Sequence, residues 1–208
     1  AVAYTPSFWN RHITHPGYGF SESLFRSDFR EGRKIGWGLN DRDFLAQSLD
    51  RLERQKRPFF ALLITLSLHF PYGDWPEDLK RLPDDHFTDE RLRNFLEAMR
   101  FLDTAVAEFF VGLEERGLLE ETVVVLYGDH DAGMWGKEIR DFFNFRARRP
   151  NWDLFDQLPL MIWLPGDDPP AGLVETTTGL IDLPVTLLAL MGVDPALYAM
   201  MGDRKSVV

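Results

Sequence analysis

Residues 122–131 read Thr-Val-Val-Val-Leu-Tyr-Gly-Asp-His-Asp, an unbroken apolar run that ends in a glycine and three polar residues. A short apolar run without a polar face predicts a strand that is buried on both sides. Two other segments have the same character, at 59–66 (Phe-Phe-Ala-Leu-Leu-Ile-Thr-Leu) and 159–164 (Pro-Leu-Met-Ile-Trp-Leu). We therefore expect three core strands, at 59–66, 122–127 and 159–164.

Helical patterns, with apolar side chains recurring every three or four residues, precede the first strand, separate it from the second and follow the third. They cover residues 42–55, 89–116 and 182–191. The expected N-terminal caps are Asn40 or Asp41, Thr88 or Asp89, and Asp182, and Gly117 is the expected end of the long helix. Strands that alternate with helices predict an α/β fold, with a mainly parallel central sheet flanked by helices on both faces. Residues 1–40 lack such a period and are expected to be mainly loop.

Length and composition fit one globular domain of 208 residues. The formal charge is −10, from 23 basic and 33 acidic side chains, which disfavours nonspecific binding to nucleic acid. The chain has no cysteine, so disulfides, thiolate nucleophiles and iron–sulfur sites are excluded. No apolar run reaches the ~18–20 residues that cross a bilayer. The first residues do not have the pattern of a signal peptide.

The segment Gly128-Asp129-His130-Asp131 is the sharpest chemical feature. Aspartate oxygen and histidine nitrogen are ligands of divalent cations such as Zn²⁺ and Mn²⁺, and a strand end holds them rigidly. The alternative is a polar turn in which the aspartate binds backbone amides and the histidine lies on the surface. A single Asp-His pair also needs at least one more ligand, so both interpretations stay open from the residues alone.

His69 follows the first predicted strand by three residues, and the carboxyl ends of strands are where α/β proteins place their sites. An imidazole there can bind a phosphoryl or sulfuryl oxygen or transfer a proton, or it can simply satisfy backbone groups in a turn. Trp9 and Arg11 lie two residues apart in the N-terminal region, and a guanidinium suits a tetrahedral oxyanion. The alternative for this pair is a tryptophan packed on the core and an arginine on the surface.

Seven short segments occur in a characteristic order. They are 8–11 (Phe-Trp-Asn-Arg), 17–20 (Gly-Tyr-Gly-Phe), 38–41 (Gly-Leu-Asn-Asp), 66–72 (Leu-Ser-Leu-His-Phe-Pro-Tyr), 127–130 (Tyr-Gly-Asp-His), 165–166 (Pro-Gly) and 181–188 (Ile-Asp-Leu-Pro-Val-Thr-Leu-Leu). Together they resemble the catalytic domain of lipoteichoic acid synthase-like phosphoglycerol transferases, in the sulfatase branch of the alkaline phosphatase superfamily. The resemblance implies a single partial sulfatase-like domain over 1–208, with 1–40 as a substrate-pocket loop region and 41–208 as the α/β core.

The resemblance also implies an activity. Enzymes of this family transfer glycerol phosphate from phosphatidylglycerol through a covalent phosphothreonine, with a bound divalent cation, usually Mn²⁺, and with Zn²⁺, Mg²⁺ or Ca²⁺ as alternatives. Matched by position, Asp129 and His130 are the implied metal ligands, and Trp9, Arg11 and His69 are implied to hold the glycerol-phosphate group. The implied partner is a phospholipid head group or a glycerol-phosphate substrate. The implied location is the extracytoplasmic face of a bacterial cell membrane, reached through an N-terminal anchor outside this chain.

In that family, the nucleophilic threonine and an acidic metal ligand lie well before the Phe-Trp-Asn-Arg segment. Because seven residues precede Phe8, we expect neither in this chain and assign it no catalytic nucleophile; Thr5 and Thr65 do not match the family's position. The chain is then expected to be the C-terminal portion of a catalytic domain, inactive alone. The alternative functions are a sulfatase or phosphoethanolamine transferase of the same superfamily, or a non-catalytic phosphate-binding remnant.

Overall fold

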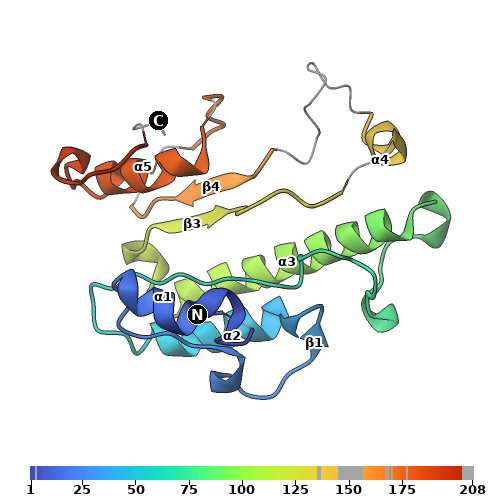
Figure 1. Ribbon diagram of the computed structural model, residues 1–208, viewed down its shortest axis with the longest axis horizontal. Coiled ribbons are helices and arrows are strands. Elements are labelled where there is room, and N and C mark those ends of the chain that lie inside the picture. Colours follow the sequence, from blue (N-terminus) through green and yellow to red (C-terminus); the bar gives the residue numbers. More distant parts are fainter. Residues whose placement is uncertain are drawn as a thin grey trace. The chain divides into compact units, whose positions relative to one another are not determined.

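Figure 1 shows a computed structural model of the chain, which describes residues 1–2, 4–134, 137–144, 157–166, 169, 171–176 and 178–202. The chain divides into two compact units. The first comprises Ala1–Thr122 and His130–Leu158, and the second comprises Val123–Asp129 and Pro159–Val208. The single domain over 1–208, with its loop region at 1–40, stays a prediction.

Two helices that pack along each other form the core of the first unit, α2 (Asp41–Leu52) and α3 (Glu90–Glu115) (Figure 1). Both were predicted from the apolar stripe, and both are confirmed. The buried side chains of the stripes include Phe44, Leu45 and Leu49 on α2 and Leu92, Phe95, Phe109 and Leu113 on α3. Gly112 allows the close approach, because a Cβ there would collide with the side chain of Leu49. Neither these nor any other helix in the described ranges is long and apolar enough to cross a bilayer.

Polar caps determine where both helices begin. The side chain of Asn40 accepts a hydrogen bond from the N–H of Asp43 at 3.0 Å. The side chain of Asp89 accepts from the N–H groups of Arg91 and Leu92 at 2.8 and 3.2 Å. These bonds satisfy amides that have no partner within the helix. Of the alternatives that the sequence offered, Asn40 and Asp89 are therefore the caps.

The end of α3 depends on Gly117, whose φ of +60° lies in the left-handed region. The N–H of Gly117 donates to the carbonyl of Glu114, and the N–H of Leu118 donates to the carbonyl of Leu113, both at 2.9 Å. This pair of bonds is the Schellman motif, which satisfies the last carbonyls of a helix. The predicted end of the long helix is confirmed.

We expect Gly117→Ala to lower the free energy of unfolding by about 1 kcal/mol, because a Cβ is unfavourable in the left-handed region. A Cβ at Gly117 would meet no other described atom within 4 Å, so the cost is conformational rather than steric crowding. Gly17, the last residue of α1 (Arg11–Gly17), is the matched control, because it is equally open and lies outside the left-handed region. Urea denaturation of both variants tests this, and equal losses would contradict it.

The N-terminal region contains regular structure that its interpretation as mainly loop missed. It includes α1 and an antiparallel hairpin of β1 (Lys34–Ile35) and β2 (Gly38–Leu39). The helix has 7 residues and each strand has 2, so none is long enough to show a period in the sequence. A further short helix of this unit is α4 (Lys137–Phe142).

The predicted strand at 59–66 is wrong. Its backbone is paired only through one isolated parallel bridge, between Ile64 and Val2. Phe60 is 75% exposed, so the segment is not buried on both sides. An apolar run becomes a strand only where a neighbouring strand binds its backbone groups over several residues. In the described residues, the amino group of Ala1 donates to the carbonyl of Leu62 at 2.6 Å and the N–H of Ile64 donates to the carbonyl of Ala1 at 3.0 Å, which makes one bridge and no ladder.

The second unit holds the other two predicted strands, β3 (Val124–Tyr127) and β4 (Leu160–Trp163), and the predicted helix α5 (Leu183–Leu190). The strands lie side by side (Figure 1) and pair antiparallel, with Val124 opposite Trp163. The expected mainly parallel central sheet is not confirmed, because both ladders among the described residues are antiparallel. A run of apolar residues specifies a strand but not the direction of its partner. Both strands are also partly exposed rather than buried on both sides.

Asp182 precedes α5 as predicted, but its side chain does not cap that helix. Its carboxylate accepts hydrogen bonds from the N–H of Gly179 at 3.0 Å and from the hydroxyl of Thr178 at 3.1 Å. The carboxylate therefore closes the short turn that leads into the helix. The prediction that the Asp182 side chain caps α5 is wrong, because the carboxylate accepts a hydrogen bond from the amide of Gly179 in the preceding turn instead of from an amide of the helix.

Candidate functional site

Asp41, the first residue of α2, binds the backbone of the turn that carries His69. The Asp41 carboxylate is fully buried and accepts hydrogen bonds from the N–H of Leu66 at 2.8 Å and of Ser67 at 3.1 Å. In return, the N–H of Asp41 donates to the hydroxyl oxygen of Ser67 at 2.9 Å. Beyond this clamp the chain turns, and the N–H of His69 donates to the carbonyl of Leu66 at 3.2 Å. The start of one helix thus determines where His69 lies.

Burial raises the pKa of Asp41 to about 6, against the hydrogen bonds from Leu66 and Ser67, which lower it. A carboxylate removed from water is destabilised in its charged form. The amide donors compensate only in part. Asp41 is therefore a buried group whose charge changes just below neutral pH.

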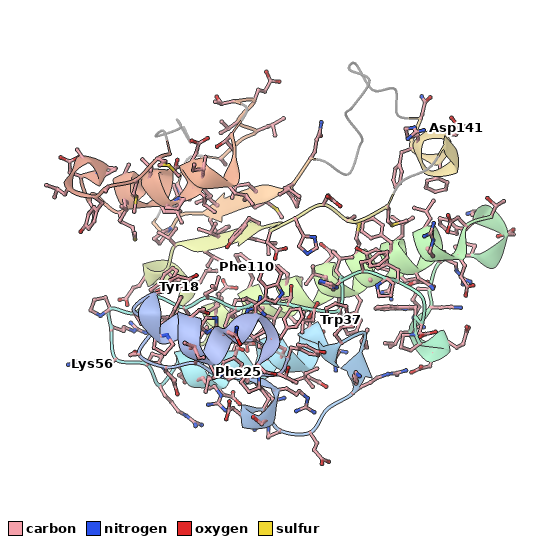
Figure 2. The ribbon with its side chains drawn as sticks, in the orientation of Figure 1. Tyr18, Phe25, Trp37, Lys56, Phe110 and Asp141 are labelled. Carbon is pink, nitrogen blue, oxygen red and sulfur yellow. The ribbon has the colours of Figure 1, made fainter. Side chains whose placement is uncertain are left out.

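The imidazole of His69 makes one hydrogen bond and two ring contacts. Its Nδ1 lies 2.7 Å from the carbonyl oxygen of Phe70, and because a carbonyl only accepts, Nδ1 carries the proton and donates. Nε2 is then the ring nitrogen that can bind a ligand. The ring centroid lies 4.4 Å from that of Trp37, which Figure 2 labels.

His130 adopts the same arrangement as His69. Its Nδ1 lies 2.7 Å from the carbonyl oxygen of Asp131, so that Nε2 is again the nitrogen with the lone pair. The two imidazoles meet edge to face, with ring centroids 5.5 Å apart. Two histidines predicted from motifs about 60 residues apart therefore lie together in the first unit.

Tyr72 ties the two histidine turns to each other. Its hydroxyl donates to the carbonyl of Ala132 at 3.1 Å, which joins the turn after His69 to the turn after His130. The amide of Asn94 on α3 donates to the carbonyl of Tyr72 at 2.8 Å. Burial, followed by the charge of Asp131, raises the pKa of Tyr72 to about 12, so the phenol remains a donor at physiological pH.

The segment with Trp9 and Arg11 reaches the histidines through aromatic rings. The guanidinium of Arg11 lies 5.7 Å from the ring centroid of Phe8, and the Phe8 ring lies 5.7 Å from that of Trp37. Trp37 then contacts His69. Trp9 is 76% exposed, and its φ of +57° places it in the left-handed region, a strained backbone of the kind that gathers at binding sites.

Sequence reasoning missed three residues that build this cluster, namely Trp37, Asp41 and Tyr72. Two of them stood inside quoted segments, but with no role beyond a possible helix cap for Asp41. Trp37 follows a glycine in a hairpin turn that was itself missed. The signal for Trp37 was only its aromatic character, because its partners are 29 and 32 residues away in the chain.

Asp129 follows β3 in the second unit, where it is exposed and separated from the strand by Gly128. The N–H of Gly128 donates to the carbonyl of Pro159 at 3.1 Å and so extends the pairing of β3 with β4. Carboxylate oxygen and imidazole Nε2 are suitable donors for a divalent cation, and the tautomer of His130 fits this role. However, the described residues contain no group of three His, Asp or Glu side chains that could hold a metal. The donor chemistry of these two residue types therefore suits a divalent cation, but the pair is not a complete ligand set.

The family model named Sulfatase matches residues 3–193. The chain belongs to the sulfatase family. The match covers most of the chain, including both histidines, Asp129 and the segment with Arg11. The resemblance expected from the seven ordered segments is thereby confirmed, and the sulfatase fold supports the α/β class.

This sulfatase-family chain is similar to lipoteichoic acid synthases. Identity is 34% to lipoteichoic acid synthase 1 of Bacillus subtilis over 94% of the chain, and 29% to the lipoteichoic acid synthase of Staphylococcus saprophyticus over 94%. Among solved structures, the lipoteichoic acid synthase LtaP from Listeria monocytogenes matches with a TM-score of 0.83 and 28% identity. That match covers 97% of this chain and 51% of LtaP.

A second solved structure, of an alkaline phosphatase superfamily protein from Vibrio parahaemolyticus, matches with a TM-score of 0.67 and 25% identity. It covers 92% of this chain and 43% of that protein. Against the curated relatives, the sulfatase-family chain spans about a third of their length, 31% of lipoteichoic acid synthase 1. The match therefore covers only part of each of these relatives.

Proposed function

We propose that this chain is part of a metal-dependent phosphoglycerol transferase, which acts on phosphatidylglycerol-type phosphoesters at the extracytoplasmic face of a bacterial membrane. The observation that carries the proposal is the contact of His69 with His130, joined through Trp37 and Phe8 to the guanidinium of Arg11. Two imidazoles and a guanidinium on one connected cluster suit a phosphate diester. The names of the similar relatives support the glycerol-phosphate chemistry.

In this proposal, Arg11 and His69 hold the phosphate. The guanidinium offers paired N–H donors to two phosphoryl oxygens. When the His69 ring is protonated, Nε2–H donates to a phosphoryl oxygen while Nδ1–H keeps its bond to the carbonyl of Phe70. Trp9, which is largely exposed on the same segment as Arg11, is proposed to contact the glycerol moiety.

Asp129 and His130 are proposed to hold a divalent cation, with Mn²⁺ as the first choice and Zn²⁺, Mg²⁺ or Ca²⁺ as alternatives. The two residues are adjacent in the chain, and the bond from His130 Nδ1 to the carbonyl of Asp131 keeps Nε2 as the ligand nitrogen. A bound cation would polarise a phosphoryl oxygen and stabilise its developing charge. Further ligands and a nucleophilic threonine are proposed to come from residues of a longer parent, which also supplies the membrane anchor and the rest of a mainly parallel central sheet.

The binding of glycerol 3-phosphate to this chain in the presence of Mn²⁺, measured by isothermal titration calorimetry, tests the proposal. We expect Arg11→Ala to weaken binding about 10- to 100-fold, because charge-assisted hydrogen bonds to the phosphate are lost. Arg11→Lys keeps the charge but not the planar fork, and it should recover part of the affinity.

Arg26→Ala is the matched control. Arg26 also lies in the N-terminal region, but its guanidinium bonds to backbone carbonyls of Phe29 and Arg30. We expect this variant to bind glycerol 3-phosphate as the wild type does. Absence of binding to the wild-type chain would contradict the proposal. Equal or tighter binding of inorganic sulfate would favour the sulfatase alternative instead.

A further inference from the structure

Trp37 occupies an anchored position at the tip of the hairpin of β1 and β2. The turn has two residues, and Gly36 precedes the tryptophan with a φ of +59°, which a glycine adopts without strain. Ile35, at the base of the turn, is buried in a core cluster with Trp75 and Ala98. The hairpin is therefore fixed to the core on one side of the turn, and the indole projects from a rigid support.

The indole lies between the two parts of the proposed phosphate site. Its ring centroid is 4.4 Å from that of His69, with planes inclined by 40°, and 5.7 Å from that of Phe8, with planes at 81°. The guanidinium of Arg11 lies over the Phe8 ring, 5.7 Å from its centroid. Trp37 is thus the residue through which His69 and the Arg11 segment are packed together.

One hydrogen bond does not fix an imidazole plane. The bond from Nδ1 of His69 to the carbonyl of Phe70 restrains one atom, while the ring torsion of histidine is broad and nearly two-fold. The indole of Trp37, whose ring centroid lies 4.4 Å away, restricts that remaining freedom more closely than the ring of His130, whose centroid lies 5.5 Å away. Without it, the imidazole could flip, exchange its tautomer and lose the orientation of Nε2.

We infer that Trp37 is a positioning residue, which holds the His69 imidazole in the single orientation that keeps Nδ1 on the carbonyl of Phe70 and leaves Nε2 to donate, once protonated, to a phosphate ester. This role rests on the proposed function, because the ligand is the one proposed there. The indole acts through His69 and Phe8 rather than through the phosphate itself. Removing the flat ring should therefore change His69 first and affinity as a consequence.

The histidine side-chain ¹H–¹⁵N spectrum of the whole chain reports on His69 without any ligand. We expect the wild type to show one tautomer of His69, protonated at Nδ1, with the signal assigned by its absence in His69→Gln. In Trp37→Leu, the signal should become a mixture of tautomers, and glycerol 3-phosphate should bind about 10-fold more weakly, as is typical when a supporting residue is removed. Trp37→Phe keeps a flat ring and should restore both.

Trp37→Met keeps apolar volume without a ring, and it is the second variant should Trp37→Leu fail to fold. Phe60→Leu is the control, because this exposed aromatic stacks on Phe20. It should leave the His69 signal unchanged. An unchanged His69 signal in both ring-deleted variants, or a wild-type ring protonated at Nε2, would overturn the inference. If glycerol 3-phosphate does not bind the wild type, the proposed function fails, while the spectrum still decides the role of Trp37.

Discussion

Replacing Asp41 with alanine is expected to lower the free energy of unfolding by about 3 kcal/mol and to release the turn that carries His69. The change leaves the N–H groups of Leu66 and Ser67 without their acceptor in a place where both residues are buried. Each buried amide without a partner costs about 1–3 kcal/mol. Chemical denaturation measures the loss, and the His69 side-chain spectrum reports the release of the turn.

Asp50→Ala is the matched control on the same helix. Asp50 is partly exposed and forms ion pairs with Arg30 and Arg116 at 3.3 and 3.4 Å. Exposed pairs of this kind contribute about 0–1 kcal/mol. A loss in Asp41→Ala that is no larger than in Asp50→Ala would mean that the clamp does not support the turn.

The same carboxylate gives stability a pH dependence of a defined sign. The pKa of Asp41 is raised by burial from 3.8 to about 6 in the folded chain. The stabilising contribution of its protonation is therefore fully present below about pH 3.8 and is lost as the pH rises through about 6. Asp41→Asn stays neutral at every pH. We expect the stability of the wild type relative to Asp41→Asn to fall by about 2–3 kcal/mol between pH 4 and pH 7. A difference that is constant across this range would refute the assignment.

Replacing Glu97 with alanine is the second large effect, and we expect it to lower the free energy of unfolding by about 3 kcal/mol, because three donors lose their acceptor. The Glu97 side chain is fully buried on α3. Its Oε1 accepts from the backbone N–H groups of Arg81 and Leu82, the latter at 2.6 Å, and its Oε2 lies 3.2 Å from Nε of Arg100. Removing it leaves two partly buried amides and the Nε–H of Arg100 without their acceptor, while the guanidinium keeps its bond to the carbonyl of Leu79. Thermal and urea denaturation measure the loss.

Glu108→Ala is the control for this prediction, because Glu108 lies on the same helix and forms a two-pronged ion pair with Arg42 at 2.6 Å in an exposed place. It should cost at most about 1 kcal/mol.

Burial by itself would raise the pKa of Glu97, but the hydrogen bonds from Leu82, Arg81 and Arg100 outweigh it and lower the pKa. The contribution of Glu97 is thus present above its ordinary pKa and is lost as the pH falls through the lowered one, the opposite sign to Asp41. A stability gap to Glu97→Gln that widens on acidification would contradict this.

The helices α2, α3 and α5 could be predicted from the sequence because their determinants are local. The caps at Asn40 and Asp89 and the stop at Gly117 bind amides and carbonyls within a few residues. The apolar stripe of α3 also depends only on spacing along the chain. Such features are complete within one helix, so they need no knowledge of what packs against it.

The strands were predictable in position but not in pairing. The segments that became β3 and β4 were recognised, yet their antiparallel register depends on two segments about 35 residues apart. The run at 59–66 is longer than either, but among the described residues it forms a single bridge, to Val2. Backbone pairing is a property of two segments, and one segment does not carry it.

By itself, the sequence determined the family, the helices α2, α3 and α5, and the residue types of the candidate site, because short motifs and periodic spacing are local features of the chain. Only the tertiary structure decided that His69 and His130 meet, that Trp37 packs on His69, and that the buried carboxylate of Asp41 binds the turn that carries His69. Each of these contacts joins residues at least 25 positions apart. The physical reason is that ring packing, desolvation and buried hydrogen bonds depend on which surfaces the fold brings together, and no spacing along the chain encodes that directly.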